Sequence, residues 1–382
     1  MVTKHLQEAA PFYKDQDFYV PSFDVTIEGK NIKPDVIRDI LSVSYRDSLT
    51  EIDSFEITIN NWDAEQRSFK YSNGHQFDPG SRIELRMGYL GQKSSKGRLK
   101  KMLTGEITSL RPSFPAQGQP TLVISGLNLL HKLRDRQVSR SYVGKTDNQI
   151  ADEIKNRLKI KIDMDKDDKA LNEKYAYLFQ DNMYDIVFLM TRAHRIGYEV
   201  FVAEESSKSD GRPGKLVYKP STDVSIKIFD LIYGLTLIEF SPELTTANQV
   251  GKVTVKGCDA VRKEPISVTV TRKKLKTGGV KIGKEKKLED AIANREEVIT
   301  NRPVNSKAEA EQLAKHILQR IAKDMVKGSG SVVGLPDLRT GCMLRLSGMG
   351  DRFDGHYFVT GTTHTIGDGG YTTRFECRLE EQ

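Results

Sequence analysis

The chain has little of what a disulfide framework or a zinc site requires. Its 382 residues include only three cysteines, Cys258, Cys342 and Cys377, and these lie far apart in the sequence. This spacing argues against paired disulfides and against a zinc site. His356 and His364 have no third ligand nearby, which favours two structural histidines over a metal pair. We therefore predict synthesis in a reducing compartment, with no metal and no cofactor.

A long hydrophobic run is also missing. The longest apolar stretch, residues 228–240, is interrupted by Asp230 and Glu239 and is shorter than the roughly 20 residues that a membrane-spanning helix needs. Residues 1–10 contain no apolar run of the kind found in secretory signals. The sequence therefore predicts no integral membrane segment and no signal peptide.

Patterns that carry catalysis or metal binding are absent or incomplete in the sequence. Asp163, Asp165 and Asp167 match the first ligand positions of a calcium loop, but Asp168 replaces the turn glycine and Lys174 replaces the bidentate carboxylate. This favours a solvated acidic loop over a metal site. No nucleophile elbow, dinucleotide fingerprint or phosphate loop occurs. We predict no catalytic residue and expect that the protein is not an enzyme.

The charge is balanced rather than concentrated. The 59 basic residues are interleaved with 52 acidic ones, which is typical of solvated faces. Residues 272–287 are the main exception, with eight Lys or Arg side chains but no aromatic residue on which a base could stack. This stretch indicates a mobile loop or an electrostatic dock on a partner protein. We expect no sequence-specific binding of nucleic acid.

One pattern of alternating apolar and polar residues occurs twice in the sequence. Near the end of the chain it comprises Gly341, the Thr-Gly pair at 360–361 and Thr372; near the beginning it comprises Gly80, the Thr-Gly pair at 104–105 and Thr121. The offsets are 261, 256 and 251 residues, so the repeat shortens only where loops intervene. Two related β units are the prediction. The alternative is that β-meanders resemble one another by chance, because the same residue types recur in any sheet.

The periodicity divides the chain into four parts. An N-terminal arm (1–20) precedes a first β-barrel domain (21–135), an α/β insert (136–240) and a second β-barrel domain (241–382), which includes the basic loop (273–297) and a helix (306–327). The predicted fold class is β-rich α+β, with two similar antiparallel β-barrel domains flanking a small α/β insert. In the first domain, residues 37–45 and 53–60 alternate as strands, and Trp62 after the second strand is expected to close the barrel core.

Three helix starts carry capping signals. Thr146 precedes Gln149 and Ser306 precedes Glu309, each three residues apart as in a capping box. Asn182 is expected to cap a further helix, which Gly197 ends. The glycines at 328 and 330 are expected to end the helix that begins after Ser306.

Five segments that span nearly the whole chain share one resemblance. They are residues 53–63 (DSFEITINNWD), 103–126 (LTGEITSLRPSFPAQGQPTLVISG), 180–202 (QDNMYDIVFLMTRAHRIGYEVFV), 249–259 (QVGKVTVKGCD) and 350–366 (GDRFDGHYFVTGTTHTI). In this order they resemble the late control D family of phage tail proteins, the baseplate hub proteins. Cys258 departs from the family's pattern, which has Trp there. The motif residues, expected to be structural, are Asp53, Phe55, Asn61, Trp62, Asp63, Gly105, Asp181, Asn182, Gly197 and Gly361.

The resemblance implies a homotrimeric ring in a contractile phage tail or an injection system. Three chains with two barrels each would present six near-equivalent positions, which would join a hexameric tail tube to a trimeric spike. The implied partners are the tube protein, the spike protein and other baseplate proteins. Synthesis in the bacterial cytoplasm and assembly into the baseplate of the particle are also implied. In related type VI secretion proteins the hub is fused to its spike, whereas no β-prism follows here, so a separate spike is expected. The alternatives are a tail-tip enzyme that degrades cell wall and a nucleic-acid-binding barrel protein.

Overall fold

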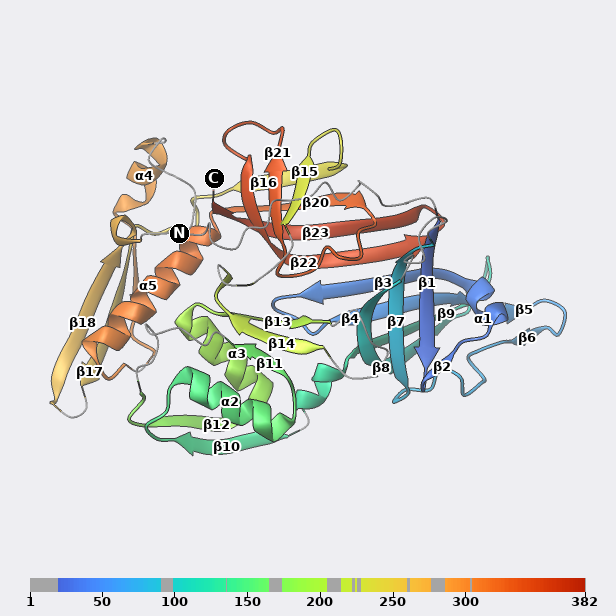
Figure 1. Cartoon of the computed structure of the whole chain (residues 1–382), viewed down its shortest axis with the longest axis horizontal. Coiled ribbons are helices and arrows are strands. Elements are labelled where there is room, and N and C mark those ends of the chain that lie inside the picture. Colours follow the sequence, from blue (N-terminus) through green and yellow to red (C-terminus); the bar gives the residue numbers. More distant parts are fainter. Residues whose placement is uncertain are drawn as a thin grey trace.

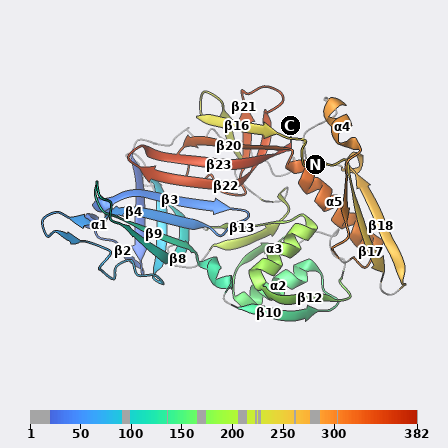
Figure 2. The same cartoon turned by 180° about the vertical axis from the view of Figure 1, so that it is seen from behind.

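The fold is dominated by one 13-stranded sheet that runs through two β units (Figure 1). The computed structural model describes residues 20–90, 99–134, 136–164, 174–204, 214–221, 224, 228–259, 262–275, 286–302 and 304–381. Two smaller α/β parts lie to one side of the sheet, and Figure 2 shows the same arrangement from behind. The predicted β-rich α+β class is confirmed.

The first β unit holds six principal strands in the order β3-β4-β9-β8-β7-β1. Their bounds are β1 Pro21–Ile27, β3 Ile40–Ser48, β4 Ser54–Asn60, β7 Arg82–Tyr89, β8 Lys100–Ser113 and β9 Thr121–Asn128. The first β unit also contains four short elements: β2 Lys30–Asn31, α1 Pro34–Asp39, β5 Trp62–Asp63 and β6 Ser68–Phe69. Alternate side chains of the principal strands fill one core, as a half-buried antiparallel sheet requires.

The second β unit repeats this order as β16-β20-β23-β22-β21-β15. Its strands are β15 Ile228–Ile232, β16 Glu239–Leu244, β20 Val326–Val333, β21 Met343–Ser347, β22 Gly355–Gly367 and β23 Gly370–Glu381. Each strand has the same place in the chain order and in the sheet order as its counterpart. One difference separates the units: β1 runs antiparallel to β7, whereas β15 runs parallel to β21.

Backbone hydrogen bonds align the two units residue by residue. The N–H of Gly80 donates to the carbonyl of Ile107 at 2.8 Å, and the N–H of Gly341 donates to the carbonyl of Val359 at 2.9 Å. Both glycines have a positive φ, +93° and +88°, which side-chain-bearing residues rarely adopt. The offset of 261 residues between the two glycines therefore joins equivalent positions.

The positions of two β-bulges show that the predicted equivalence of Thr104 and Thr360 is wrong. The register of β8 shifts between Ile107 and Ser109, and that of β22 shifts between Val359 and Gly361. The skipped residues are Thr108 and Thr360, so Thr360 corresponds to Thr108 and not to Thr104. The third strand keeps the predicted offset of 251, because Asn60 pairs with Thr121 as Val333 pairs with Thr372. The Thr-Gly string occurs by chance four residues before the true equivalent.

The first insert lies between β9 and β15. It comprises η1 Leu129–Arg134, β10 Gln137–Tyr142, α2 Asp147–Leu158, β11 Ile162–Met164, β12 Leu178–Tyr184, α3 Asp185–Ile196, β13 Glu199–Ala203 and β14 Lys215–Lys219. Thr146 caps α2 with the predicted capping box, and Gly197 ends α3. The hydrophobic faces of both helices pack on a core of their own. Because β15 and β16 belong to the second β unit, the insert ends before the boundary expected at residue 240.

A second insert occupies the connection between β16 and β20. It comprises β17 Lys252–Asp259, β18 Glu264–Thr271, η4 Arg272–Lys274, α4 Lys286–Ala293, β19 Glu296–Ile299 and α5 Lys307–Lys323. The apolar stripe of α5 covers the sheet β18-β17-β19 and forms a separate core. The predicted loop 273–297 is therefore wrong in part, because it contains α4 and the start of β19; residues 276–285 lie outside the described residues.

Several local predictions also need correction. The helix after Ser306 ends at Lys323, and Gly328 and Gly330 lie inside β20, where a Cβ on Gly328 would lie 2.5 Å from the ring of Phe240. These glycines therefore serve packing rather than chain termination. Asn182 does not cap α3: it lies in β12 with φ +43°, and the helix begins at Asp185. The strand predicted at residues 37–45 begins at Ile40, because residues 37–39 end the helix α1 that Pro34 begins.

Candidate functional site at the junction of the two β units

The two β units meet where β22 changes partner. Its first half pairs with β21, and after the bulge at Thr360 its second half pairs with β3 of the first unit. Three cross-strand pairs place their side chains inward: Thr362 with Asp47, His364 with Tyr45, and Ile366 with Val43. Continuous backbone pairing therefore joins residues about 300 positions apart.

A buried ion pair lies beneath this strand junction. Nε of Arg339 donates to Oδ2 of Asp47 at 2.7 Å, and the two side chains are 17% and 3% exposed. The guanidinium also donates to the carbonyl of Met102 at 2.9 Å and to the hydroxyl of Tyr45, and it stacks 4.3 Å from the centre of the Tyr45 ring. One arginine from a loop of the second unit thus binds two strands of the first unit, β3 and β8.

The Asp47 carboxylate accepts further hydrogen bonds from the second unit. Thr340 donates through its hydroxyl at 2.9 Å and its N–H at 3.2 Å, and Thr362 donates through its N–H at 3.1 Å and through its hydroxyl. Burial by itself would raise the pKa of Asp47, but the Arg339 charge and the hydrogen bonds from the side chains of Thr362 and Arg339 outweigh burial and lower it. Asp47 is therefore a fixed anion in the joint.

Asp53 behaves in the opposite way. Burial and the nearby charge of Asp47 raise its pKa well above the ordinary value, and its Oδ2 accepts a 3.2 Å hydrogen bond from Tyr45. Two carboxyl groups in one buried cluster thus have different protonation preferences, because only Asp47 receives the arginine directly.

His364 is locked into one neutral form. Its Nε2 lies 3.0 Å from the carbonyl of Leu338, so Nε2 carries the proton and donates. Nδ1 then accepts from the hydroxyls of Tyr371 at 3.0 Å and Thr373 at 3.1 Å. Burial, reinforced by the Arg339 charge, lowers the pKa of His364 to about 3. With both nitrogens occupied, this histidine is a structural group, as the sequence predicted.

Other buried ion pairs tie the inserts to the β units. Lys101 of β8 lies 3.3 Å from Glu204, which follows β13, and both side chains are at most 3% exposed. Arg378 of β23 pairs with Glu199 of β13 and, at 3.1 Å, with Glu380. The same pattern therefore recurs between each β unit and the first insert.

The second insert is held in a similar way. Nζ of Lys323, at the end of α5, lies 2.8 Å from Glu380 of β23, and Arg195 of α3 donates to Glu309 of α5 at 2.8 Å. The ring of His316 lies against Gly197, where a Cβ would come within 2.5 Å of Nδ1. Breaking one partner of a buried pair leaves an uncompensated charge, so such contacts fix the relative positions of the parts.

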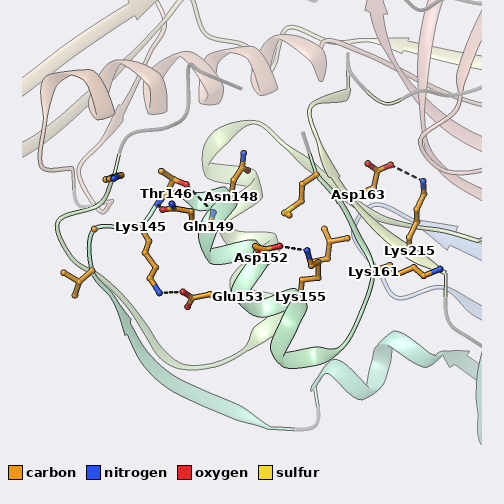
Figure 3. A pocket seen from close by; sticks show the side chains of 15 residues that line it. Lys145, Thr146, Asn148, Gln149, Asp152, Glu153, Lys155, Lys161, Asp163 and Lys215 are labelled. Atoms are coloured by element: carbon orange, nitrogen blue, oxygen red, sulfur yellow. Dashed lines mark hydrogen bonds and ion pairs between the residues drawn. The ribbon is translucent and has the colours of Figure 1, made fainter. Parts of the chain in front are cut away.

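An open groove lies in the first insert, beside α2 (Figure 3). Figure 3 shows its charged lining side chains pairing with one another: Lys145 with Glu153, Lys155 with Asp152, and Lys215 with Asp163. Lys219 also contacts Asp163 at 2.6 Å. The groove is therefore largely neutralised by its own ion pairs.

The calcium-loop alternative gains no support. Burial would raise the pKa of Asp163, but hydrogen bonds from Lys219 and Lys215 lower it, so two lysines occupy the position that a cation would take. Asp165, Asp167 and Asp168 lie outside the described residues. In the part of the chain that is described, no group of three His, Cys, Asp or Glu side chains could hold a metal ion, and the three cysteines are free thiols.

Four of the predicted motif residues lie in or near the junction and the first core. Asp53 belongs to the buried cluster, and Phe55 lies 2% exposed in the first core. Gly361 follows the bulge in β22, where a Cβ would lie 3.3 Å from the carbonyl oxygen of Asp47. Gly105 packs so closely on β9 that a Cβ would lie 2.4 Å from the carbonyl oxygen of Leu127. These glycines are needed for close backbone approach.

Another three motif residues build the turn after β4. Asn61 is fully buried, and its Oδ1 accepts from the N–H groups of Tyr71 and Ser72 at 2.9 and 3.1 Å. Asp63 accepts from the next backbone N–H groups, as predicted for a turn. Trp62 does not close the core: it is half-buried and packs 5.4 Å from the ring of Phe69.

In the motif QDNMYD, at residues 180–185, the buried residues are not the two that were predicted to be structural. Asp181 and Asn182 are exposed on β12, whereas Gln180 and Asp185 are buried. Gln180 donates to Asp185 at 2.9 Å, and Arg157 also donates to that carboxylate. The packed residues of this motif are therefore the ones at its two ends.

The residues of the junction that sequence reasoning missed are Arg339, Asp47 and Tyr45. Asp47 and Arg339 are 292 residues apart, and no local pattern marks either of them. The one usable signal was the glycine at 341, which was aligned with Gly80 and follows Arg339 by two positions.

Comparison with known proteins finds a family model that covers most of the chain. A family model described as "Alg8 N-terminal domain" matches residues 18–368. A search of the curated proteins found no match. No helix among the described residues is long and apolar enough to cross a membrane.

Solved structures share the fold over almost the full length. The 43 kDa tail protein of prophage MuSo2 from Shewanella oneidensis matches with a TM-score of 0.67 and 14% identity, over 94% of this chain and 98% of that one. A tail protein from Neisseria meningitidis MC58 matches with 0.64 and 15%, over 94% and 97%. A type VI secretion component from E. coli matches with 0.57 and 11%, over 94% and 77%. At these identities the likeness is one of fold.

Proposed function

This chain belongs to the Alg8 N-terminal domain family, and we propose from its fold that it is the structural baseplate hub of a contractile phage tail or injection system. Three copies would form a ring with two β units each, and this ring would join a hexameric tail tube to a trimeric spike. The resemblance to late control D proteins supports this assignment. So does the fold likeness to two proteins described as tail proteins and to one described as a type VI secretion component.

The internal repeat is the observation that carries the proposal. Six strands recur in the same chain order and the same sheet order, and the equivalent residues are identified by matching hydrogen bonds and bulges. A chain with two equivalent units can offer six similar positions in a trimer, which matches threefold to sixfold symmetry.

The buried joint supports the same function. A symmetry adaptor must hold its two units at a fixed angle, because relative motion of the units would disturb the sixfold arrangement that contacts the six tube subunits. The pair of Arg339 with Asp47 and the strand pairing of β22 with β3 provide that rigidity. The ion pairs of Lys101 and Arg378 fix the first insert to the same frame.

Sedimentation velocity of the purified protein, alone and with its spike partner, tests the proposal. The expected species contains three copies of the 43.1 kDa chain in at least one of the two conditions, and with the spike bound its mass also includes that of the spike. A protein that stays monomeric in both would count heavily against a trimeric hub.

We also propose that the protein is not an enzyme. The buried histidine at the joint has both nitrogens occupied, and every carboxylate that lines the groove pairs with a lysine of the same lining. Turnover assays on peptidoglycan, with a known cell-wall hydrolase as positive control, should give no product above background. Cleavage that persists after repurification would favour a tail-tip enzyme instead.

A further inference from the structure

We infer that neighbouring copies of this chain join by pairing the outer end of β8, residues 109–114, with β16 of the next copy, in a register that the chain itself specifies. This inference rests on the proposed function, because it describes how a ring of copies would close. Its source is the joint inside the chain, where the second half of β22 pairs with β3. Since β8 is the counterpart of β22 and β16 is the counterpart of β3, the same joint can form between copies.

Both edges are open among the residues that the structure describes. β7 and the residues just before it cover β8 only as far as Ile107, and residues 109–113 of β8 pair on one side, with β9. β16 pairs on one side as well, with β20. An open strand edge presents unpaired backbone groups and is a template for another chain.

The register follows from the alignment of the two units. Val43 pairs with Ile57 in the first unit as Phe240 pairs with Gly330 in the second, so Phe240 is the counterpart of Val43. Ile366, the partner of Val43 within the chain, corresponds on the β8 side to Phe114. Transfer of the whole joint gives six pairs between copies: Ser109 with Thr245, Leu110 with Leu244, Arg111 with Glu243, Pro112 with Pro242, Ser113 with Ser241, and Phe114 with Phe240.

The chemistry of these pairs suits a joint. On the inward face, every pair is apolar: Leu110 with Leu244, Pro112 with Pro242, and Phe114 with Phe240. Phe114 is 57% exposed in the single chain, whereas its counterpart Ile366 is 7% exposed inside the chain's own joint. Burial of such a ring removes apolar surface from water, which is the main driving force of association.

The outward face of the same six pairs is polar. Arg111 lies opposite Glu243, so the one charged pair combines opposite signs. Arg111 already donates to Glu56 at 2.7 Å, and Glu243 would add a second carboxylate to the same guanidinium. Cross-strand pairs of opposite charge stabilise a sheet, and like charges would oppose it.

Two prolines favour this register of β8 on β16 over other registers. The N–H of Thr245 donates to the carbonyl of Met325, the residue before β20, so residues 240, 242 and 244 direct their backbone groups to the open edge. Pro242 and Pro112 thus lack a donor where the two edges meet, as is common for edge strands. The transferred register places the two prolines opposite each other, so both missing donors fall at one point. Pairs 110–244 and 114–240 keep their hydrogen bonds.

A disulfide between copies tests the register. Ser113 and Ser241 form a non-hydrogen-bonded pair, in which Cα atoms lie about 4.5 Å apart, inside the range of about 4.4–6.8 Å that a disulfide spans. The variant S113C/S241C, in a C258S background to remove the exposed native thiol, should form chains cross-linked up to a covalent trimer under mild oxidation. Within one chain the two residues are separated along the sheet by β20, β23, β22, β3, β4 and β9.

Controls separate this inference from the proposed function. The variant S109C/S241C moves one thiol four residues along β8, roughly 13 Å, and should remain uncross-linked. A trimer in sedimentation without any S113C/S241C cross-link overturns this interface and leaves the hub intact. A monomer in both measurements overturns the hub and the interface together. Cross-linked ladders longer than three chains support the strand pairing but contradict the closed ring.

Discussion

Replacing Arg339 by Met should destabilise the joint between the β units more than any surface change. The methionine keeps most of the apolar stem but removes the charge, which leaves the Asp47 carboxylate buried at 3% exposure without its cation. Removal of one partner from a buried ion pair costs about 3–5 kcal/mol. Thr340 and Thr362 still donate to the carboxylate, so the loss should lie near the lower end, at about 3 kcal/mol.

Urea unfolding measures this loss. Trp62 is the sole tryptophan and reports on the first unit, while far-UV circular dichroism reports on the whole sheet. The matched control is Arg46→Met on β3, beside Asp47, whose exposed pair with Glu51 at 3.4 Å should contribute about 0–1 kcal/mol. In the double variant R339M/D47N no uncompensated charge remains, so at least half of the lost stability should return.

The pH dependence gives an independent check on the cause. In the native protein the lowered pKa of Asp47 contributes stability above its ordinary value, about 3.9, and this contribution is lost as the pH falls through the folded-state pKa. In R339M the same carboxyl is buried without its cation, so its pKa should rise and the penalty should disappear below about pH 4. If R339M is as stable as the native protein at pH 7, or if the gap does not narrow in acid, the reasoning is refuted.

Three further predictions concern the joint and the proposed interface. Gly341→Ala should cost several times more than Gly350→Ala in thermal unfolding: both have φ near +90°, worth about 1–2 kcal/mol, but only at Gly341 would a Cβ meet an aromatic ring, at 2.4 Å. The protein should lose stability as the pH falls from 6.5 toward 3, because the pKa of His364 is lowered to about 3 in the folded state and the unfolded state therefore binds more protons. This dependence of the unfolding free energy on pH, up to about 1.4 kcal/mol per pH unit, should be smaller in H364Q. Protonation of the His364 ring above pH 5 in an NMR titration would contradict the prediction. Phe114→Asp should convert trimers to monomers in sedimentation, whereas Val143→Asp, at an equally exposed apolar position of the first insert, should leave the mass unchanged.

The repeat was visible in the sequence where the same hairpin recurs without insertion. Gly80 is equivalent to Gly341 because both have a similar positive φ, and Thr121 is equivalent to Thr372 because each pairs with the corresponding residue of the neighbouring strand. The remaining counterparts, β3 with β16 and β4 with β20, were not predictable. In the first unit a short turn joins these strands, but in the second unit an entire α/β insert separates them.

The buried polar cluster was beyond reach for a different reason. Local patterns reveal caps, turns and strand faces, because these depend on residues a few positions apart. The contact of Arg339 with Asp47 depends on two chain segments that only the complete sheet brings together. Glycines were misread for a related reason: at Gly328 the decisive neighbour is the ring of Phe240, which no short window contains.

End-on images of the purified assembly test the central claim most directly. Class averages from electron microscopy, calculated without imposed symmetry, should show a ring of six similar lobes built from three chains, alternating between the first and second β units. A monomeric particle, or a trimer whose end-on views show three lobes with no sixfold component, would contradict the account.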